Sequence, residues 1–218
     1  MRSVALFLCL CLLARGSALV VNAAEPEWKS LFDGKTLKDW KAPDFGAQGE
    51  VEVKDGQLLL NFGNGATGAT YTADFPKANY EIALSAMRVE GNDFFCGLTF
   101  PVQDSPCTLI IGGWGGNLVG LSSINGYDAS ENDTSSHQEL KSQTWYKIRL
   151  RVLPERITAW IDDKEVVDKD IRGAKLSIRN EMFLSKPLGL TSWKTTAALK
   201  DIRYRLLNAE EQKEAQPK

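Results

Sequence analysis

The chain has 218 residues, with 26 Lys and Arg against 28 Asp and Glu and a formal net charge of -2. It contains no basic stripe interleaved with aromatic residues, so nucleic acid is not an expected partner. It also contains no phosphate-binding loop, dinucleotide fingerprint, zinc-ligand spacing or nucleophile elbow. Phosphate and nicotinamide chemistry are therefore unsupported.

Residues 1–24 have the pattern of an export signal, with a basic start, an apolar run over 4–14 and small residues at Ala23 and Ala24. The apolar run is shorter than the roughly 20 residues that span a bilayer. We expect a secreted or periplasmic protein with no membrane insertion after signal cleavage. Its single domain should cover residues 25–207, and the polar tail at 208–218 should be disordered or weakly helical.

The first predicted elements form a hairpin over Val51–Leu60, where Asp55-Gly56 supplies the two positive-φ positions of a tight turn. Downstream, Trp145–Val152 alternates between apolar and basic residues, which is typical of a strand half buried in a sheet. Arg156–Ile161 follows it, and after a turn Glu165–Asp168 completes a three-strand meander.

Further short segments rich in β-formers lie between turn signals, while helical periodicity is nearly absent. In the last predicted strand, Leu199–Leu207, we expect Ile202, Tyr204 and Leu206 to face inward. About a dozen strands in one domain predict an all-β fold, a two-sheet antiparallel jelly-roll sandwich with one outer face left for a ligand. These further predicted strands are Tyr80–Arg88, Phe94–Phe100, Cys107–Ile111, Leu118–Ser122, Leu188–Trp193 and Leu199–Leu207.

Two cysteines remain after the signal, Cys96 and Cys107. They lie in neighbouring predicted strands that could form a hairpin, and an oxidising compartment would permit a disulfide between them. The alternative is a pair of buried thiols that act as small apolar side chains.

The segment Trp28-Lys-Ser-Leu-Phe-Asp-Gly-Lys-Thr-Leu-Lys-Asp-Trp40 resembles the opening of the 3-keto-disaccharide hydrolase domain family, a concanavalin-like or laminin-G-like jelly roll. The resemblance continues to Leu199-Lys-Asp-Ile-Arg203 and covers most of the mature chain. The sequence departs from the family where a His-Gly turn usually follows the penultimate strand, since it has Ser192-Trp193-Lys194 there. The family's usual catalytic groups therefore cannot be carried over residue by residue.

The resemblance implies a reaction on glycosides already oxidised to a ketone at C3. A base would remove the acidic C2 proton, the glycosidic leaving group would depart by elimination, and water would add. Such a site needs a carboxylate or His as base, and a donor or cation beside the enolate oxygen.

Candidate carbohydrate-binding residues gather around Gly112-Gly-Trp-Gly-Gly116, whose glycines would leave the Trp114 ring at a surface where a sugar face can stack. The alternative is that Trp114 packs over a sheet end. Other candidates for substrate binding are Arg88, Asp93, Asn125, Tyr127 and Trp193.

The candidate catalytic residues are Asp128, Glu131 and the only histidine, His137. No cofactor is required by the sequence. However, Asp128, Glu131 and Asp133 supply several oxygens in a short loop and could bind Ca²⁺. The plain alternatives are a solvated polar loop with turn-capping acids, and a surface histidine.

Three functions follow as hypotheses: an exported hydrolase or lyase acting on 3-keto-glycosides, a non-catalytic carbohydrate-binding module, or a module that binds another envelope protein. The first is favoured because the resemblance covers nearly the whole chain. The third would require a flat apolar patch around Trp114.

Overall fold

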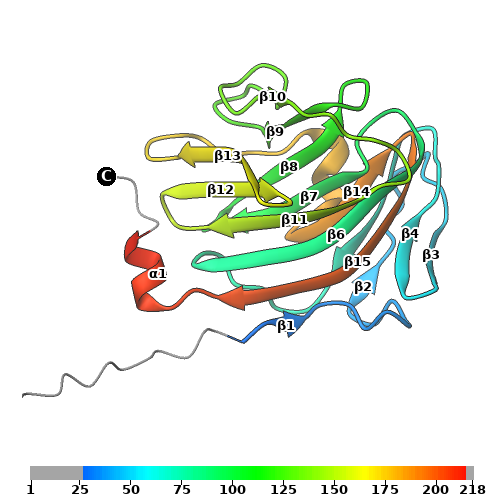
Figure 1. The fold of residues 1–218 in the computed structure, drawn as a ribbon, viewed down its shortest axis with the longest axis horizontal. Helices are drawn as coiled ribbons and strands as arrows, with labels where there is room; N and C mark the ends of the chain where they lie inside the picture. The colour runs from blue at the N-terminus through cyan, green and yellow to red at the C-terminus, as the bar shows by residue number, and fades with distance from the viewer. Residues whose placement is uncertain (1–26, 215–218) are drawn as a thin grey trace, which may run out of the picture.

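The computed structural model describes residues 27–214 as two antiparallel sheets packed face to face (Figure 1). The predicted two-sheet sandwich is therefore confirmed. The predicted signal at 1–24 and the last four residues of the tail lie outside the described residues. Within 27–214 no helix is long and apolar enough to cross a membrane.

Sheet A has the strand order β13-β12-β11-β6-β15-β4-β3, and β1 (Lys29–Ser30) pairs with β15. The predicted hairpin forms with Asp55 at φ 50° and Gly56 at φ 78°, and the meander is also present. The bounds are β3 (Val51–Lys54), β4 (Gln57–Leu60), β6 (Tyr80–Gly91), β11 (Trp145–Val152), β12 (Arg156–Ile161), β13 (Lys164–Asp170) and β15 (Thr195–Leu206).

Sheet B has the order β10-β9-β8-β7-β14-β5-β2. Three of its strands were not predicted: β2, β5 and β10. A 3-10 helix, η1 (Asn180–Ser185), precedes β14. The strand bounds are β2 (Trp40–Lys41), β5 (Ala66–Tyr71), β7 (Cys96–Val102), β8 (Ser105–Gly113), β9 (Leu118–Ser122), β10 (Ser136–His137) and β14 (Leu188–Trp193).

The main core lies between the sheets and is filled by alternate residues of the longer strands, such as Ile148 and Leu150 of β11. In β15 the predicted alternation holds for Ile202 and Tyr204 but is wrong for Leu206, which is 51% exposed. Both register shifts of β15 against β6 lie before Tyr204, so the exposure of Leu206 reflects its position as the last residue of the strand.

The predicted disulfide is wrong. Cys96 and Cys107 lie on the paired strands β7 and β8, but Cys96 is opposite Ile111 and Cys107 is opposite Phe100. Both are free, buried thiols in the main core, which is the alternative reading of the sequence. Burial in apolar surroundings raises the pKa of each thiol to about 12, so neither is a reactive thiolate at neutral pH.

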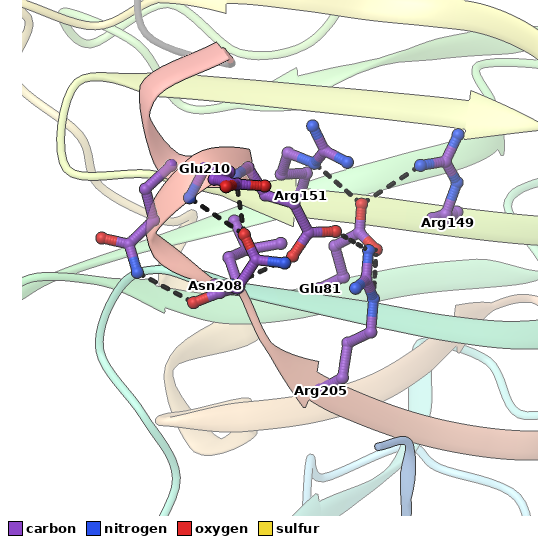
Figure 2. A network of polar contacts seen from close by, with 9 residues as sticks. Glu81, Arg149, Arg151, Arg205, Asn208 and Glu210 are labelled. Carbon is purple, nitrogen blue, oxygen red and sulfur yellow. Dashed lines mark hydrogen bonds and ion pairs between the residues drawn. The ribbon is translucent and has the colours of Figure 1, made fainter. Parts of the chain in front are cut away.

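A buried carboxylate organises the outer face of sheet A (Figure 2). Glu81 of β6 is 1% exposed, and its oxygens accept hydrogen bonds from Arg149 at 3.1 Å, Arg151 at 2.8 Å and Arg205 at 2.8 Å. Burial alone would raise the pKa of Glu81, but the charges and hydrogen bonds of Arg151 and Arg205 lower it below its usual 4.5. Glu81 thus joins β6, β11 and β15 as an ionised group.

The same network holds the short helix α1 (Ala209–Glu214) against the sheet. Asn208 caps the helix by accepting from the backbone N–H groups of Glu210 and Glu211, and the Glu211 carboxylate accepts from the Asn208 N–H in return. Glu211 also pairs with Arg205 at 2.7 Å. The tail was expected to be disordered or weakly helical, and its described part forms this short helix.

Replacing Glu81 should destabilise the fold strongly. In Glu81→Gln the arginines lose their common partner, and we expect about 3 kcal/mol less free energy of unfolding, measured by chemical denaturation at pH 7. Glu90→Gln, the same change at an exposed site on β6, is the control and should cost under about 0.5 kcal/mol. Because the folded pKa of Glu81 is depressed, its contribution is present above pH 4.5 and is lost as the pH falls through the folded value. Equal stability of the two variants would contradict this role.

Candidate functional site

The outer face of sheet B is covered by two segments, and the candidate site is the part they leave open. Small and hydroxyl side chains face outward here, including Thr99, Thr108 and Thr191, which alternate with core residues on β7, β8 and β14. A second apolar cluster forms on this face, and its buried members are Ala66, Phe94, Ile110, Leu118, Ala129 and Met182.

The first covering segment is the oxygen-rich loop that follows β9. The end of this loop turns back to the sheet, where Thr134 Oγ1 accepts a hydrogen bond from the backbone N–H of Leu121 at 2.8 Å. The second segment runs from 174 to 187 and includes η1. The two segments pair through Ile124 and Leu176, and the guanidinium of Arg179 bonds Asp128 at 2.9 Å.

Between these covers lies a pocket of about 200 Å³. It is mainly apolar, with Trp114 and Trp193 as its large rings, and it holds two carboxylates and one guanidinium. Trp114 is 45% exposed, and Trp193 is half-buried against Phe94 with the ring centroids 6.5 Å apart. The lining residues are Asp93, Phe94, Thr108, Ile110, Trp114, Ser122, Arg179, Glu181, Met182 and Trp193.

Asp93 is the half-buried carboxylate of the pocket. Burial raises its pKa above the usual 3.8, while the backbone N–H groups of Phe94 and Trp114 and the charges of Arg88 and Lys194 act in the opposite direction. Its Oδ1 accepts from the Phe94 N–H at 2.7 Å, which fixes the side chain at the start of the β7 region. A positioned carboxylate with a raised pKa is suited to proton transfer.

Glu181 is the second carboxylate and has the opposite environment. Its hydrogen bond from Arg179, at 3.0 Å, lowers its pKa. Arg179 therefore bridges Asp128 and Glu181 and places a cation at the pocket wall, where it can face a developing negative charge.

Trp114 is presented by a strained loop that is supported from inside the sandwich. Trp114 has φ 46°, and Gly112 beside it has φ 82°. A Cβ on Gly112 would lie 2.7 Å from Arg88 Nη2, so only glycine fits against the buried guanidinium. Arg88 donates to the carbonyls of Gly116 and Leu140, and its pKa is lowered by burial.

Arg88 thus lies behind the loop instead of in the pocket, which corrects its prediction as a substrate-binding residue. It is 5% exposed and extends from β6 in sheet A to the loop after β8 in sheet B. Asp93, Trp114 and Trp193, also predicted to bind substrate, do line one pocket.

The predicted catalytic and calcium-binding acids do not converge. Asp128 caps a turn at Ser130 and pairs with Arg179, Asp133 pairs with Lys169 at 2.5 Å, and Glu131 is exposed. Within residues 27–214 no three His, Cys, Asp or Glu side chains are arranged to hold a metal ion. The calcium site is therefore not supported.

His137, Tyr127 and Asn125 also lie away from the pocket. His137 is exposed on the edge strand β10, and Tyr127 is 58% exposed in the covering loop. Asn125, at φ 53°, accepts from the Lys175 N–H at 2.8 Å and so helps to join the two covering segments. Sequence reasoning missed Arg179, Glu181 and Met182, and only the pairing of their segment with the loop after β9 brings them to the site.

The overall fold is shared with several solved structures. One is the carbohydrate-binding module CBM66 from Bacillus subtilis, with 14% identity, TM-score 0.53, and 77% of this chain and 95% of that chain covered. Another is a protein of unknown function with a galectin-like fold from the same organism, with 11% identity, TM-score 0.56, and coverage of 79% and 92%. A third is a prokaryotic β-1,3-1,4-glucanase (lichenase) derived from a mouse hindgut metagenome, with 11% identity, TM-score 0.50, and coverage of 77% and 93%.

These similarities define the fold of the chain as a β-sandwich. The chain belongs to the 3-keto-alpha-glucoside-1,2-lyase-like domain family, whose model matches residues 27–205. This confirms the family resemblance seen in the sequence. A comparison with curated proteins finds no match.

Removing the Arg88 guanidinium should loosen the loop that carries Trp114. Arg88→Met would leave the buried carbonyls of Gly116 and Leu140 without their donors, and we expect about 3 kcal/mol less free energy of unfolding. Arg172→Met removes an arginine whose side chain is 51% exposed, and this control should lower the free energy of unfolding far less than Arg88→Met does. Chemical denaturation of both variants measures the difference, and similar losses would show that Arg88 is not an internal support.

Proposed function

We propose that this chain is an exported enzyme that cleaves glycosides bearing a ketone at C3, and that the pocket between Trp114 and Trp193 is its active site. The observation that carries the proposal is a half-buried carboxylate with a raised pKa, Asp93, in an aromatic-walled pocket of a chain from this family. Aromatic rings with a few convergent polar groups are the usual arrangement of a small-molecule site.

In the proposed reaction Asp93 takes the C2 proton, and the electrons of the C2–H bond form an enolate with the C3 ketone. The enolate then expels the glycosidic oxygen from C1, and a C1–C2 double bond forms. The expelled oxygen takes up a proton and leaves as an alcohol. Water adds its oxygen to C1 and a proton to C2, giving the free 3-keto sugar. Arg179 is the cation available to stabilise the enolate oxygen.

A second candidate, a carbohydrate-binding module without catalysis, is favoured by the exposed ring of Trp114 and by the fold shared with CBM66. Both functions use the same pocket. They differ in whether Asp93 transfers a proton, so one substitution separates them.

The decisive variant is Asp93→Asn, which keeps the shape and the Oδ1 acceptor but removes the base. We expect the rate of leaving-group release from an aryl 3-keto-glucoside to fall about 100-fold or more, with binding retained. Asp163→Asn, an exposed turn position outside the pocket, is the control and should keep full activity. Binding without turnover in the parent protein would instead favour the binding module.

The pH profile gives an independent test of the base. Asp93 must be ionised to accept a proton, so kcat/KM should fall as the pH is lowered through its pKa, which lies above 3.8 because of burial. Asp93→Asn should abolish this acidic limb. A profile that is unchanged in the variant would assign the base to another group.

Export is the part of the proposal that depends on residues 1–24. Expressed in a bacterial host, the full chain should be recovered outside the cytoplasm with a new N-terminus after Ala23 or Ala24, whereas a chain that begins at Glu25 should stay inside. N-terminal sequencing of both fractions is the measurement. Retention of the full chain in the cytoplasm with Met1 intact would contradict export.

A further inference from the structure

The outer face of sheet A carries two rows of basic side chains. The strands β11 and β15 both pair with β6, one on each side of it. Successive side chains of a strand point to opposite faces, so the residues of these strands that do not enter the core point outward. The outward basic residues are Lys147, Arg149 and Arg151 on β11, and Lys200, Arg203 and Arg205 on β15.

The register aligns the two rows pair by pair across β6. The short side chains of Ser85 and Ala83 lie between the first two pairs, and Glu81 lies between the third. Neighbouring strands lie about 4.8 Å apart, so the two rows are roughly 10 Å apart at the backbone. Asp201, at the irregular part of β15, adds a carboxylate that accepts from Ser85 Oγ at 3.4 Å.

This part of the face has an excess of positive charge. Glu81 is 1% exposed, and its single negative charge is shared by three guanidinium groups that reach it from β11 and β15 (Figure 2). Within residues 27–214, only Glu81 and Glu211 form ion pairs with the six basic residues. Lys147 and Arg203 are exposed, so they can pair with a ligand.

Tryptophan rings beside the two rows hold some of the basic groups in place. A cation above an aromatic ring is attracted by the ring, and this limits the movement of a long side chain. A ligand that pairs with such a cation loses less side-chain entropy when it binds. The distances to the ring centroids are 3.7 Å for Arg149 Cζ over Trp160, 4.3 Å for Lys200 Nζ over Trp145, and 4.9 Å for Arg203 Cζ over Trp28.

These features suit a polymer that carries negative charges along its length. Arg149 has a 38% exposed side chain and donates to Glu81 through Nη1, which leaves donors for a carboxylate or sulfate. Single-stranded nucleic acid is usually bound through bases stacked on open aromatic rings. Here a basic side chain lies over each of the three rings, so the charged rows are the main feature open to a ligand.

We infer that the outer face of β6, β11 and β15 is a second binding surface, which takes an acidic polysaccharide along β6 between the two rows of basic side chains. Carboxylate and sulfate groups share the chemistry that this surface recognises. The surface lies on the sheet opposite the pocket, so it would hold the protein on a polymer without occupying the pocket. Only the choice of a glycan as the carrier of the charges rests on the proposed function.

The experiment uses three polymers with the same backbone: dextran, carboxymethyl dextran and dextran sulfate. Their binding to the protein that begins at Glu25 is measured by isothermal titration calorimetry at low and at high salt. We expect both charged dextrans to bind and the uncharged one not to bind, with an affinity that falls as the salt concentration rises.

The matched variants locate the surface. The double variant Lys147→Gln, Arg203→Gln removes one exposed cation from each row, and we expect the affinity for dextran sulfate to fall about 10-fold or more. The control Lys38→Gln, Lys175→Gln makes the same change of charge at exposed residues outside sheet A, and it should change the affinity less than about 2-fold. If the first double variant does not fold, Lys147→Gln is compared with Lys38→Gln.

Three results would overturn the inference: no binding of either charged dextran, equal binding of dextran and dextran sulfate, or similar affinities in the two double variants. A single-stranded oligonucleotide that binds more tightly than dextran sulfate would overturn the choice of a glycan. Asp93→Asn should bind dextran sulfate as the parent protein does, since Asp93 lines the pocket in the other sheet. Failure of the proposed enzyme activity is therefore distinguishable from failure of this surface.

Discussion

The structure depends on one constraint: sheet B is covered on both faces. Its inner face packs against sheet A, and its outer face packs against η1 and the loop after β9. A sheet buried on both sides cannot alternate between apolar and polar residues, and β7 and β9 are accordingly buried at every position. The outer face carries small side chains and short hydroxyl side chains instead of long polar or charged ones, because short side chains let the covering segments approach closely.

The pocket follows from that constraint. It is the part of the outer face that the covers do not reach, and its charged groups come from the rim of the sheet and from the covers themselves. Asp93 precedes β7, while Arg179 and Glu181 precede or begin η1. The buried Arg88 supports the same rim from inside, so the position of Trp114 depends on contacts made between the two sheets.

Sequence patterns predicted the strands that have one polar face or a clear turn. The basic and apolar alternation of β11 and the Asp55-Gly56 turn were sufficient, and the bounds of β9 and β14 were predicted correctly from their apolar content. The strand β5 was missed because half of Ala66–Tyr71 is Ala or Gly, which carry little β signal although they are buried here. The disulfide prediction failed because the pairing register of a hairpin decides which residues are opposite, and spacing alone does not give it.

The site was less predictable than the fold, since its members are brought together from distant segments. Trp114, Trp193 and Asp93 were found through local glycines, aromatic side chains and a position near a sheet rim. The density of acids in the loop after β9 predicted a catalytic or calcium-binding role for them, but Asp128 holds Arg179 and Asp133 pairs with Lys169. A cluster of oxygens in sequence does not show where its carboxylates point, and here the local turns and ion pairs direct them apart.

The pKa values of the two carboxylates that line the pocket are shifted in opposite directions, and this difference supports the roles proposed for them. Glu181 is held in its charged form by Arg179, which makes it a weaker proton acceptor and a fixed part of the wall. Burial destabilises the anionic form of Asp93 and so raises its pKa, which makes Asp93 the stronger proton acceptor of the two. Arg179 is already paired with Asp128 and Glu181, and it can therefore stay at the pocket wall while the charge of a bound sugar changes. The cation and the far wall of the pocket, Arg179 and Met182, thus depend on how the covering segment is fixed to sheet B, while the proposed base, Asp93, is held at the start of the β7 region.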